Sequence, residues 1–501
     1  MYNIMKPTTS LVFAVYLSLL PVHAADNPFT PPNFPVPKFP NKTYSVMDFG
    51  ARGDGATNDT PAINKAIAAC SDGGGGTVDF PSGKYAAASI HIRSNVRLLL
   101  DKDAVIFGGA EEDFDAPEPN AFDQYQDFGH SHFHNSLMWG KNIENFAIEG
   151  GKLNGGSIIK TDSPKGGDKL VTVVMGKNLL FKNVTHDQKG GHFIYLLNDC
   201  ENVTMDHVVI HQTRDGVDLM GCRNVQISNC HFTDCGDDAI GVKSDYALGR
   251  KILTENIYVW DCYLESRCNG LQFGSETTSE FRNCNFWNIE IGLAAKAGIG
   301  MSMNDGGVVN GVNYSNIVIR RAATPIFMSI TDRLRSGDPN KKIGSIKNVH
   351  IMNVTASCEP GREKTVFTST ISGLPESSLE NITLENVKLT YPGGGLAPEG
   401  EIVPPLHPDG FAPRNYGRRP AAGFYIRYAK NLVFKNVQIA FEHPDHRPTI
   451  VASEVDGFTL DGFSAQKPEG VAMLRQSNVK NLTVRNSPGL PDQKAELMNK
   501  K

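Results

Sequence analysis

A short alternation of apolar and polar residues recurs along most of the chain. Each copy starts at an Asn, places apolar residues at every second position, and ends with Asn or Asp before a Cys or apolar residue. Asn-Val-Gln-Ile-Ser-Asn-Cys at 224–230 is one example. Alternation of this kind predicts a β-strand with one buried face. Copies begin at Asn142, Asn178, Asn202, Asn224, Asn256, Asn316, Asn348, Asn381, Asn431 and Asn481, with a weaker one at Gly457.

The spacing of these copies predicts a solenoid. Steps of 22 to 24 residues join the copies between 178 and 224, whereas longer steps, such as the one from 224 to 256, should carry longer loops. A strand repeated with a period above 20 residues is typical of a parallel β-helix, whose coils stack on one another. We therefore expect an all-β fold in which the repeat Asn side chains form hydrogen-bond ladders at the turns. A β-sandwich of irregular strands is the alternative, and it does not account for so many copies in one orientation.

The N-terminal region predicts export. It combines a positive charge at Lys6, a short apolar run and a Val-His-Ala cleavage site, as a secretory signal does. We expect a secreted or periplasmic protein without a membrane anchor. The chain divides into a signal peptide at 1–24, a Pro-rich leader at 25–43, a β-helix catalytic domain at 44–487 and a C-terminal tail at 488–501.

An amphipathic helix is predicted near the start of the solenoid. Asp59 or Thr60 would cap it, Pro61 would lie in its first turn, and the Gly run at 73–76 would end it. Such a helix would cover the open edge of the first coil, so we expect a single parallel β-helix with an N-terminal capping helix. Its apolar face would consist of Ala62, Ile63, Ala66 and Ile67.

Charge and cysteine content narrow the class of protein. The formal net charge of −5 argues against a nucleic-acid binder, although an acidic polysaccharide could bind where basic residues gather in a cleft. Nine Cys in an exported chain would ordinarily indicate disulfides. Their spacing here instead predicts mostly free, buried thiols in two stacks, one with Cys200 and Cys222 and the other with Cys230, Cys262 and Cys284.

Four Asp residues mark the candidate active site. Asp215 and Asp218 lie in one repeat, and the pair Asp237 and Asp238 begins 22 residues after Asp215. One period of a solenoid corresponds to one coil, roughly 4.8 Å along the axis, so we expect these side chains to cluster. A lone Asp at a turn is usually structural, but clustered carboxylates repel, and at least one should stay protonated to unusually high pH. Acid catalysis of glycoside cleavage requires such a group.

These segments resemble glycoside hydrolase family 28, the polygalacturonase family. Asp-Gly-Val-Asp at 215–218 and Asp-Asp-Ala-Ile-Gly-Val-Lys-Ser at 237–244 match its signatures, and Phe-Gly-Ala-Arg-Gly-Asp-Gly at 49–55 resembles the start of many pectin-acting β-helix proteins. The resemblance implies a right-handed parallel β-helix and inverting hydrolysis of α-linked galacturonate. It also implies that Asp237 is the general acid and that Asp215 and Asp238 activate the water, without a cofactor.

Two departures from the family pattern concern the substrate. The family's Gly-His-Gly falls on Cys268, Asn269 and Gly270, and its Arg-Ile-Lys falls on residues 294–296, so that Ala294 replaces the Arg and Lys296 remains. The resemblance implies that the lost Arg would bind a uronate carboxylate. We therefore expect Asn269 and Ala294 to disfavour plain galacturonan and to favour rhamnogalacturonan-type or substituted pectin, with loss of catalysis as the alternative.

Further residues are candidates for substrate binding. Lys243, Arg267 and, less specifically, Arg250 could place positive charge near the acids, and Tyr425 could reach the cleft from a later coil. His130, His132 and His134 alternate along a predicted strand, where they could line the cleft. Zinc is the alternative, but no acid or Cys at ligand spacing completes a site, so we expect no metal and assign His132 to the substrate.

The resulting hypothesis is an exported, monomeric glycosidase that acts on an acidic plant-type polysaccharide or oligosaccharide. One alternative is a pectate-lyase-like or epimerase enzyme on the same fold, which would use a Lys, Arg or Tyr base; a lyase would form an unsaturated product. The other is a non-catalytic carbohydrate-binding β-helix, which would bind glycans without releasing reducing ends.

Overall fold

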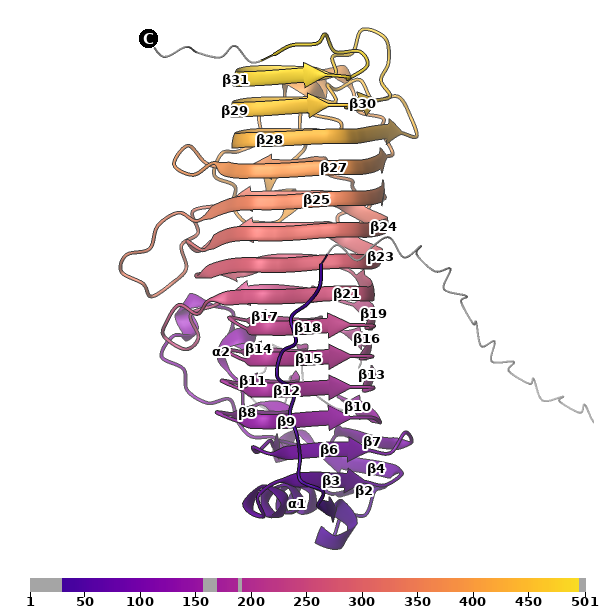
Figure 1. The fold of residues 1–501 in the computed structure, drawn as a ribbon, viewed down its shortest axis with the longest axis vertical. Coiled ribbons are helices and arrows are strands. Elements are labelled where there is room, and N and C mark those ends of the chain that lie inside the picture. Colours follow the sequence, from indigo (N-terminus) through magenta and orange to yellow (C-terminus); the bar gives the residue numbers. More distant parts are fainter. Residues whose placement is uncertain (1–28, 156–168, 188–191, 495–501) are drawn as a thin grey trace, which may run out of the picture.

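The strands form a long stack of parallel coils in the computed structural model (Figure 1). The structure describes residues 29–155, 169–187 and 192–494, so the predicted signal peptide and the end of the predicted tail lie outside the described residues. A mostly β, parallel β-helical architecture is thereby confirmed. The right-handed turn that the family resemblance implies stays a prediction, as do the domain boundaries.

The repeat produces short strands in the first half of the stack and long, continuous ones in the second. The first half contains β1 (Thr43–Ser45), β2 (Asp54–Asn58), β3 (Gly76–Phe80), β4 (Gly83–Ala87), β5 (Ile90–His91), β6 (Val96–Leu100), β7 (Ala104–Gly108), β8 (Ser136–Lys141), β9 (Glu144–Glu149), β10 (Lys152–Asn154), β11 (Lys169–Val174), β12 (Lys177–Lys182), β13 (Thr185–Asp187), β14 (Phe193–Asn198), β15 (Glu201–Asp206), β16 (Val209–Thr213), β17 (Asp215–Met220), β18 (Arg223–Ser228), β19 (His231–Cys235) and β20 (Ile240–Ser244). The second half contains β21 (Thr254–Ser266), β22 (Leu271–Thr277), β23 (Glu280–Met303), β24 (Val308–Ile330), β25 (Ser345–Cys358), β26 (Ser369–Ser372), β27 (Leu379–Tyr391), β28 (Phe424–Phe441), β29 (Ile450–Asp461), β30 (Ser464–Ala465) and β31 (Leu474–Arg485).

Because the strands pair in register, equivalent positions of successive coils lie directly opposite one another. Tyr195 of β14 lies opposite Val217 of β17, which lies opposite Ile240 of β20. The same column continues through Leu271 of β22 to Ile299 of β23. The inward side chains of these columns form one continuous apolar core along the stack.

Two side-chain ladders confirm the predicted Asn stacks. Asn202 donates to Asn178 at 2.9 Å and receives a hydrogen bond from Asn224 at 2.9 Å, and the series runs in both directions. The first ladder passes through Asn145 rather than the predicted Asn142. These Asn residues adopt positive φ, which Asn tolerates better than other residues with a side chain. The second ladder includes Asn288, Asn316, Asn353, Asn386 and Asn436.

All nine cysteines are free and buried, as expected for packed thiols. His231 lies opposite Tyr263, which sets Cys230 against Cys262 one coil on. The predicted third member of that stack is wrong, because Cys284 lies opposite Ile257 and so occupies a different column.

Helix α1 (Thr60–Asp72) lies at the N-terminal end of the stack (Figure 1). Asp59 is its N-cap residue and Gly73 its C-cap residue, as predicted, and its four predicted apolar residues are buried together with Cys70. It contacts β1, β3, β5 and β6. In the described part of the chain, each helix is too short or too polar to cross a bilayer.

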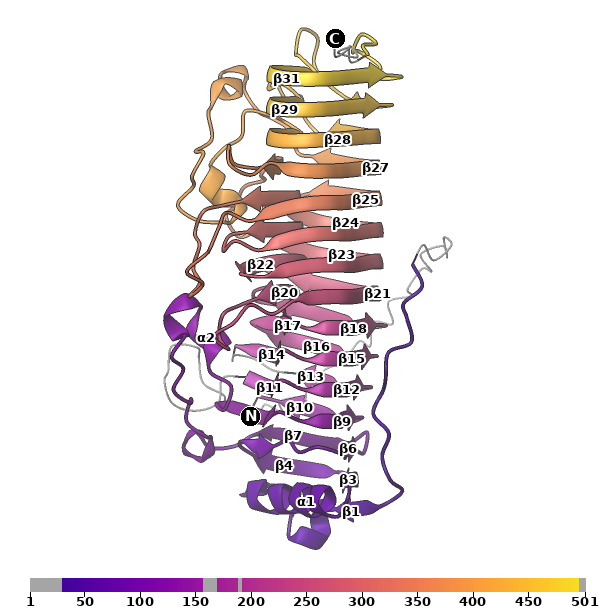
Figure 2. The same cartoon turned by 60° about the vertical axis from the view of Figure 1, so that its left-hand side comes forward.

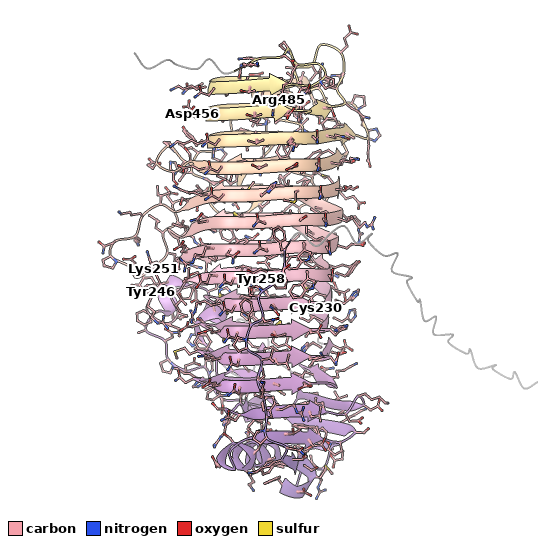
Figure 3. All side chains as sticks on the ribbon, viewed as in Figure 1. Cys230, Tyr246, Lys251, Tyr258, Asp456 and Arg485 are labelled. Carbon is pink, nitrogen blue, oxygen red and sulfur yellow. The ribbon has the colours of Figure 1, made fainter. Side chains whose placement is uncertain are left out.

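Segments outside the coils lie on two sides of the stack. Residues 29–42 run along one side (Figure 2), where Phe34 packs against Tyr258, a residue labelled in Figure 3. Another side carries the segment 109–135 with its short helix α2 (Phe128–Ser131). Higher on that side lies the segment 392–423 between β27 and β28.

We predict that Asn202→Ala lowers the free energy of unfolding by about 2–4 kcal/mol. The substitution removes two partly buried side-chain hydrogen bonds and leaves a residue with a Cβ but no polar group at a φ of 57°. Denaturant unfolding of the whole chain measures the change. Asn340→Ala, at an exposed loop position outside the ladders, is the matched control. Equal stability of the two variants would show that the ladder contributes little.

Candidate active site

Three aspartates from successive coils meet at one point of the stack. Asp215 begins β17, whereas Asp237 and Asp238 precede β20. The Asp237 amide donates to the Arg214 carbonyl at 2.6 Å, and the Gly216 amide donates to the Asp238 carbonyl at 2.9 Å. A Cβ on Gly216 would lie 2.4 Å from the Ala239 carbonyl oxygen, so this close approach requires glycine. The predicted one-coil relationship between the acids is therefore confirmed.

Buried cations hold the acids together. Lys243 lies beneath the cluster with its Nζ 3.0 Å from Asp218 Oδ2 and 3.6 Å from Asp215 Oδ2. Arg214 lies on the more open side, 3.6 Å from Asp215 and 3.4 Å from Asp237. The sequence suggested Lys243 for substrate binding, but the contacts of Lys243 are with the acids. Arg214 was not predicted, although it directly precedes Asp215.

The environment separates the pKa values of the three carboxyls. Burial and then the Asp218 charge raise the pKa of Asp215 well above its usual range. Burial and then the adjacent Asp237 raise the pKa of Asp238 to about 6. Burial alone would raise the pKa of Asp237 too, but the charges of Lys296 and Arg214 outweigh it and lower that pKa. The expected high-pKa carboxyl is present, but in the unliganded site it is not Asp237, the proposed acid.

The two departures from the family pattern have different places in the structure. Asn269 donates from Nδ2 to Asp238 Oδ1 at 2.7 Å and accepts from the Ala297 amide at 3.1 Å, so it fixes a catalytic carboxylate. The Lys296 side chain interacts with the charge of Asp237, and the Lys296 backbone amide donates to the Cys268 carbonyl. Ala294 is fully buried in the apolar core. The expectation that it lines a substrate subsite is therefore wrong, because its side chain faces inward.

Arg362 places a cation where the sequence indicated none. Its amide donates to the Ala295 carbonyl at 3.2 Å, which fastens the loop after β25 to β23 beside Lys296. A Cβ on the preceding residue, Gly361, would lie 2.0 Å from that carbonyl oxygen. The Arg362 side chain is exposed and forms no ion pair with a described residue. In the sequence, only the long spacing between the repeat copies at Asn348 and Asn381 indicated this loop.

A cavity of about 530 Å³ opens beside the acids. Gly236, which precedes Asp237, lies in its wall, together with Ser266, Ala295 and Arg362. Arg267 also lines it and pairs with Asp234 at 2.9 Å, in agreement with a place in the cleft. Arg250 instead pairs with Asp199, and no described contact joins it to the cluster.

Segment 109–135 packs against the cluster through His130. His130, on α2, lies 3.6 Å from Asp218 Oδ2 and 3.3 Å from Glu276 Oε2. Asn120 donates to the Ala247 carbonyl, and Phe122 packs edge-on against Tyr246, which Figure 3 labels on this side. The predicted strand of three alternating His residues is wrong, because this stretch forms α2 and a following loop. The Asp and Asn residues of the loop make such local turns favourable.

His132 and Tyr425 lie away from the acids. His132 is buried with Nδ1 2.6 Å from the Glu118 carbonyl oxygen and Nε2 3.3 Å from Asp123 Oδ1, and both partners lie in its own segment. Tyr425 lies on β28, opposite Thr370 of β26, with the Arg427 guanidinium over its ring at 5.7 Å. These contacts give no support to the assignment of His132 and Tyr425 to the substrate, which stays a prediction.

A second buried ionic group supports His130. Glu276 accepts from Arg335 at 2.6 Å, and Arg335 also pairs with Asp127 at 3.0 Å. Burial and the nearby Lys243 charge lower the pKa of His130, but the Glu276 charge and the hydrogen bonds to Asp218 and Glu276 together outweigh them and raise that pKa to about 9. His130 is therefore cationic at neutral pH. Sequence reasoning missed Glu276 and Arg335, because neither belongs to the repeat.

Two groups of side chains could in principle ligate a cation. One comprises Asp127, His130 and Glu276, and the other comprises Asp237, Asp238 and Cys268. In the first, Arg335 already bridges both carboxylates. In the second, the charges of Lys296 and Arg214 act on Asp237. The protein's own cations thus balance both groups, and the donor sets do not call for a metal.

Comparisons with known proteins agree with this geometry. The family model "Glycosyl hydrolases family 28" matches residues 82–402. A probable polygalacturonase of Vitis vinifera is 23% identical over 69% of this chain and 74% of its own length. An exo-poly-alpha-D-galacturonosidase of Dickeya chrysanthemi is 23% identical over 69% and 71%.

The fold is similar to that of solved structures as well. The family 28 exopolygalacturonase of Yersinia enterocolitica superimposes with a TM-score of 0.64 at 17% identity, covering 89% of this chain and 78% of that one. The family model spans well over half of the chain and contains all three clustered aspartates. This protein belongs to glycosyl hydrolases family 28 and is a glycoside hydrolase of the pectin-acting, polygalacturonase-like class.

Proposed function

We propose that this protein is exported and hydrolyses α-linked galacturonate-containing polysaccharide or oligosaccharide, of pectin or rhamnogalacturonan type, with inversion at the anomeric carbon. The observation that carries the proposal is the meeting of Asp215, Asp237 and Asp238 beside a cavity that Arg267 and Arg362 line. Asp234 and Glu265 also line this cavity and Arg267 pairs with Asp234, so Arg362 is the cation left for an acidic sugar beside the acids.

Asp237 has the best position for the general acid. Its side chain is 26% exposed, whereas that of Asp215 is only 4% exposed, so Asp237 is the more accessible to a glycosidic oxygen. It would donate a proton to that oxygen as the bond to the anomeric carbon breaks. Asp215 and Asp238 would accept a proton from a water molecule that attacks the opposite face of the sugar.

Substrate charge offers a way to protonate Asp237. Lys296 and Arg214 hold the pKa of the unliganded Asp237 low. A galacturonate carboxylate bound to Lys296 and Arg362 would offset part of that positive charge and raise the pKa of Asp237. Asp237 would then be protonated mainly when an acidic sugar is bound. Because Arg362 supplies a second cation, plain galacturonan fits this site despite Ala294.

The closed side of the cluster favours action at a chain end. Segment 109–135 reaches the cluster through the contact of His130 with Asp218, whereas a cavity opens at Gly236. A polysaccharide that runs toward later coils can extend from the cavity, whereas one that continues past His130 meets buried side chains. We therefore propose that the enzyme removes short products from one end.

We predict that Asp237→Asn lowers kcat on polygalacturonate by at least about 100-fold with little change in thermal stability. The amide keeps the shape of the carboxyl but cannot donate the proton, and general acid catalysis is worth roughly 10²–10⁴-fold. Reducing-end release measures the rate, and Asp187→Asn, at a half-exposed position on β13, is the control. More than about a tenth of the wild-type rate in Asp237→Asn would refute the role.

Product analysis in the same assay separates the alternatives. The proposal expects short products of uniform size from the first minutes and no ultraviolet-absorbing unsaturated sugar. An unsaturated product would instead identify a lyase. Binding without any reducing-end release would identify a non-catalytic binding protein.

We predict that Lys296→Ala and Arg362→Ala each weaken kcat/KM about 5- to 150-fold on an acidic oligosaccharide, and much less on its chemically reduced, neutral counterpart. Each variant leaves a desolvated carboxylate with one cation fewer, a loss of about 1–3 kcal/mol. Lys177→Ala, an exposed Lys on β12, should change neither. Equal losses on both substrates would show that these positions do not recognise charge.

We predict that Asn269→Ala moves the acidic limb of the kcat/KM profile to higher pH by about one unit. Asp238 must be ionised to accept a proton from water, so activity should fall as pH falls through about 6, the raised pKa of this group. The Asn269 amide stabilises the ionised form, and a hydrogen bond to a charged group is worth about 1.5 kcal/mol or more. Asn340→Ala is the control. An unmoved limb in Asn269→Ala would exclude Asp238 as the group that controls it.

A further inference from the structure

Arg419 is a buried cation without a carboxylate partner among the described residues. It is 1% exposed, donates from Nε to Thr370 Oγ1 at 3.1 Å, and donates from one terminal nitrogen to the Gly417 carbonyl. Its other terminal nitrogen has no hydrogen-bond acceptor in the described part of the chain. The guanidinium lies over the Phe367 and Tyr416 rings at 5.1 and 5.6 Å, but these contacts leave its charge without an anion. A buried charge without a counter-charge is costly, so this guanidinium can still accept an anion.

A basic cavity of about 510 Å³ contains this guanidinium in its wall. Lys364, Arg418 and Arg447 line it as well, and none of its lining residues is acidic. Arg418 pairs with Glu399, and Arg447 pairs with Asp445, so these two cations are already neutralised. Lys364 and Arg419 form no ion pair with a described residue. Two residues of the cavity wall, the exposed Lys364 and the buried Arg419, therefore carry positive charge without a counter-charge among the described residues.

The basic cavity lies farther along the stack on the open side of the active site. Residues 360–368 connect the two places, because Arg362 lines the cavity beside Gly236 while Lys364 and Phe367 line the basic cavity. The register from Gly241 of β20 reaches Thr370, the partner of Arg419, in four coil-to-coil steps. Four coils correspond to about 19 Å along the axis. A glycan held at the acids and extending toward later coils would pass this cavity.

We propose that the basic cavity is a distal subsite that binds the carboxylate of a uronate several sugars away from the cleaved bond. Guanidinium groups bind carboxylates through charge-assisted hydrogen bonds, and the half-buried Phe367 in the wall offers an apolar surface to a sugar ring. The inference rests on the proposed function, since the ligand is the same acidic glycan. It adds a length requirement that the catalytic cluster alone does not impose.

The test measures binding of galacturonate oligomers of two to eight sugars to the Asp237→Asn protein by calorimetry. In that background, Arg419→Gln should weaken binding of the longest oligomers roughly tenfold or more and leave the dimer unchanged. Lys364→Ala, an exposed position that does not threaten folding, should weaken them about threefold. Lys388→Ala, exposed on β27 and outside the cavity, is the charge-matched control.

The outcomes separate this subsite from the proposed function. Unchanged affinity for long oligomers in both Lys364→Ala and a folded Arg419→Gln would overturn the subsite, as would equal losses on the dimer or on reduced, neutral oligomers. If Arg419→Gln does not fold, Lys364→Ala decides alone. Failure of the parent to bind any oligomer would reject the proposed function, and with it the subsite.

Discussion

The register between parallel coils is the constraint on which the rest of the structure depends. Each coil repeats the backbone of the one before it, so a residue is brought beside its counterpart one period away. This constraint places Asp215 next to Asp237 and Asp238, whose backbones are joined by hydrogen bonds from Asp237 to Arg214 and from Gly216 to Asp238. It also generates the Asn ladders, because a side chain that bonds its counterpart on one coil can do so on the next.

Stacking alone would produce an unstable site, since it gathers like charges in a buried place. Lys243 lies under Asp215 and Asp218, and Arg214 lies between Asp215 and Asp237. These cations allow the carboxylates to remain close, and the unequal distribution of charge separates their pKa values. His130, itself held by Glu276, closes the arrangement from a segment outside the coils. The coils thus place both the acids and the cations Lys243 and Arg214, and the inserted segment 109–135 adds His130.

Much of the fold could be predicted from the sequence, because the repeat is local and dense. The alternating pattern predicted the strands, and the repeated Asn residues predicted the ladders. The Gly and Pro residues around α1 predicted where this helix begins and ends. The aspartate cluster followed from the offset of 22 residues between Asp215 and Asp237. Errors arose where the exact register of a coil matters: Cys262 lies opposite Ile289 rather than Cys284, and Ala294 faces the core rather than the substrate.

The parts of the site that the sequence did not reveal come from loops. Arg362, His130 and Arg419 lie in segments that interrupt the repeat, where no period indicates which coil a side chain will reach. Their positions depend on specific contacts, such as the Arg362 amide on the Ala295 carbonyl. Long steps between repeats indicated that loops exist, but not where their cations would lie.

The central claim is single-displacement hydrolysis by this carboxylate cluster, and the configuration of the first product tests it most directly. Proton NMR during cleavage of an α-linked galacturonate oligomer should show the β anomer at the newly formed reducing end before mutarotation. Initial release of the α anomer would require a covalent intermediate on one of the aspartates and would contradict the roles assigned to Asp215, Asp237 and Asp238.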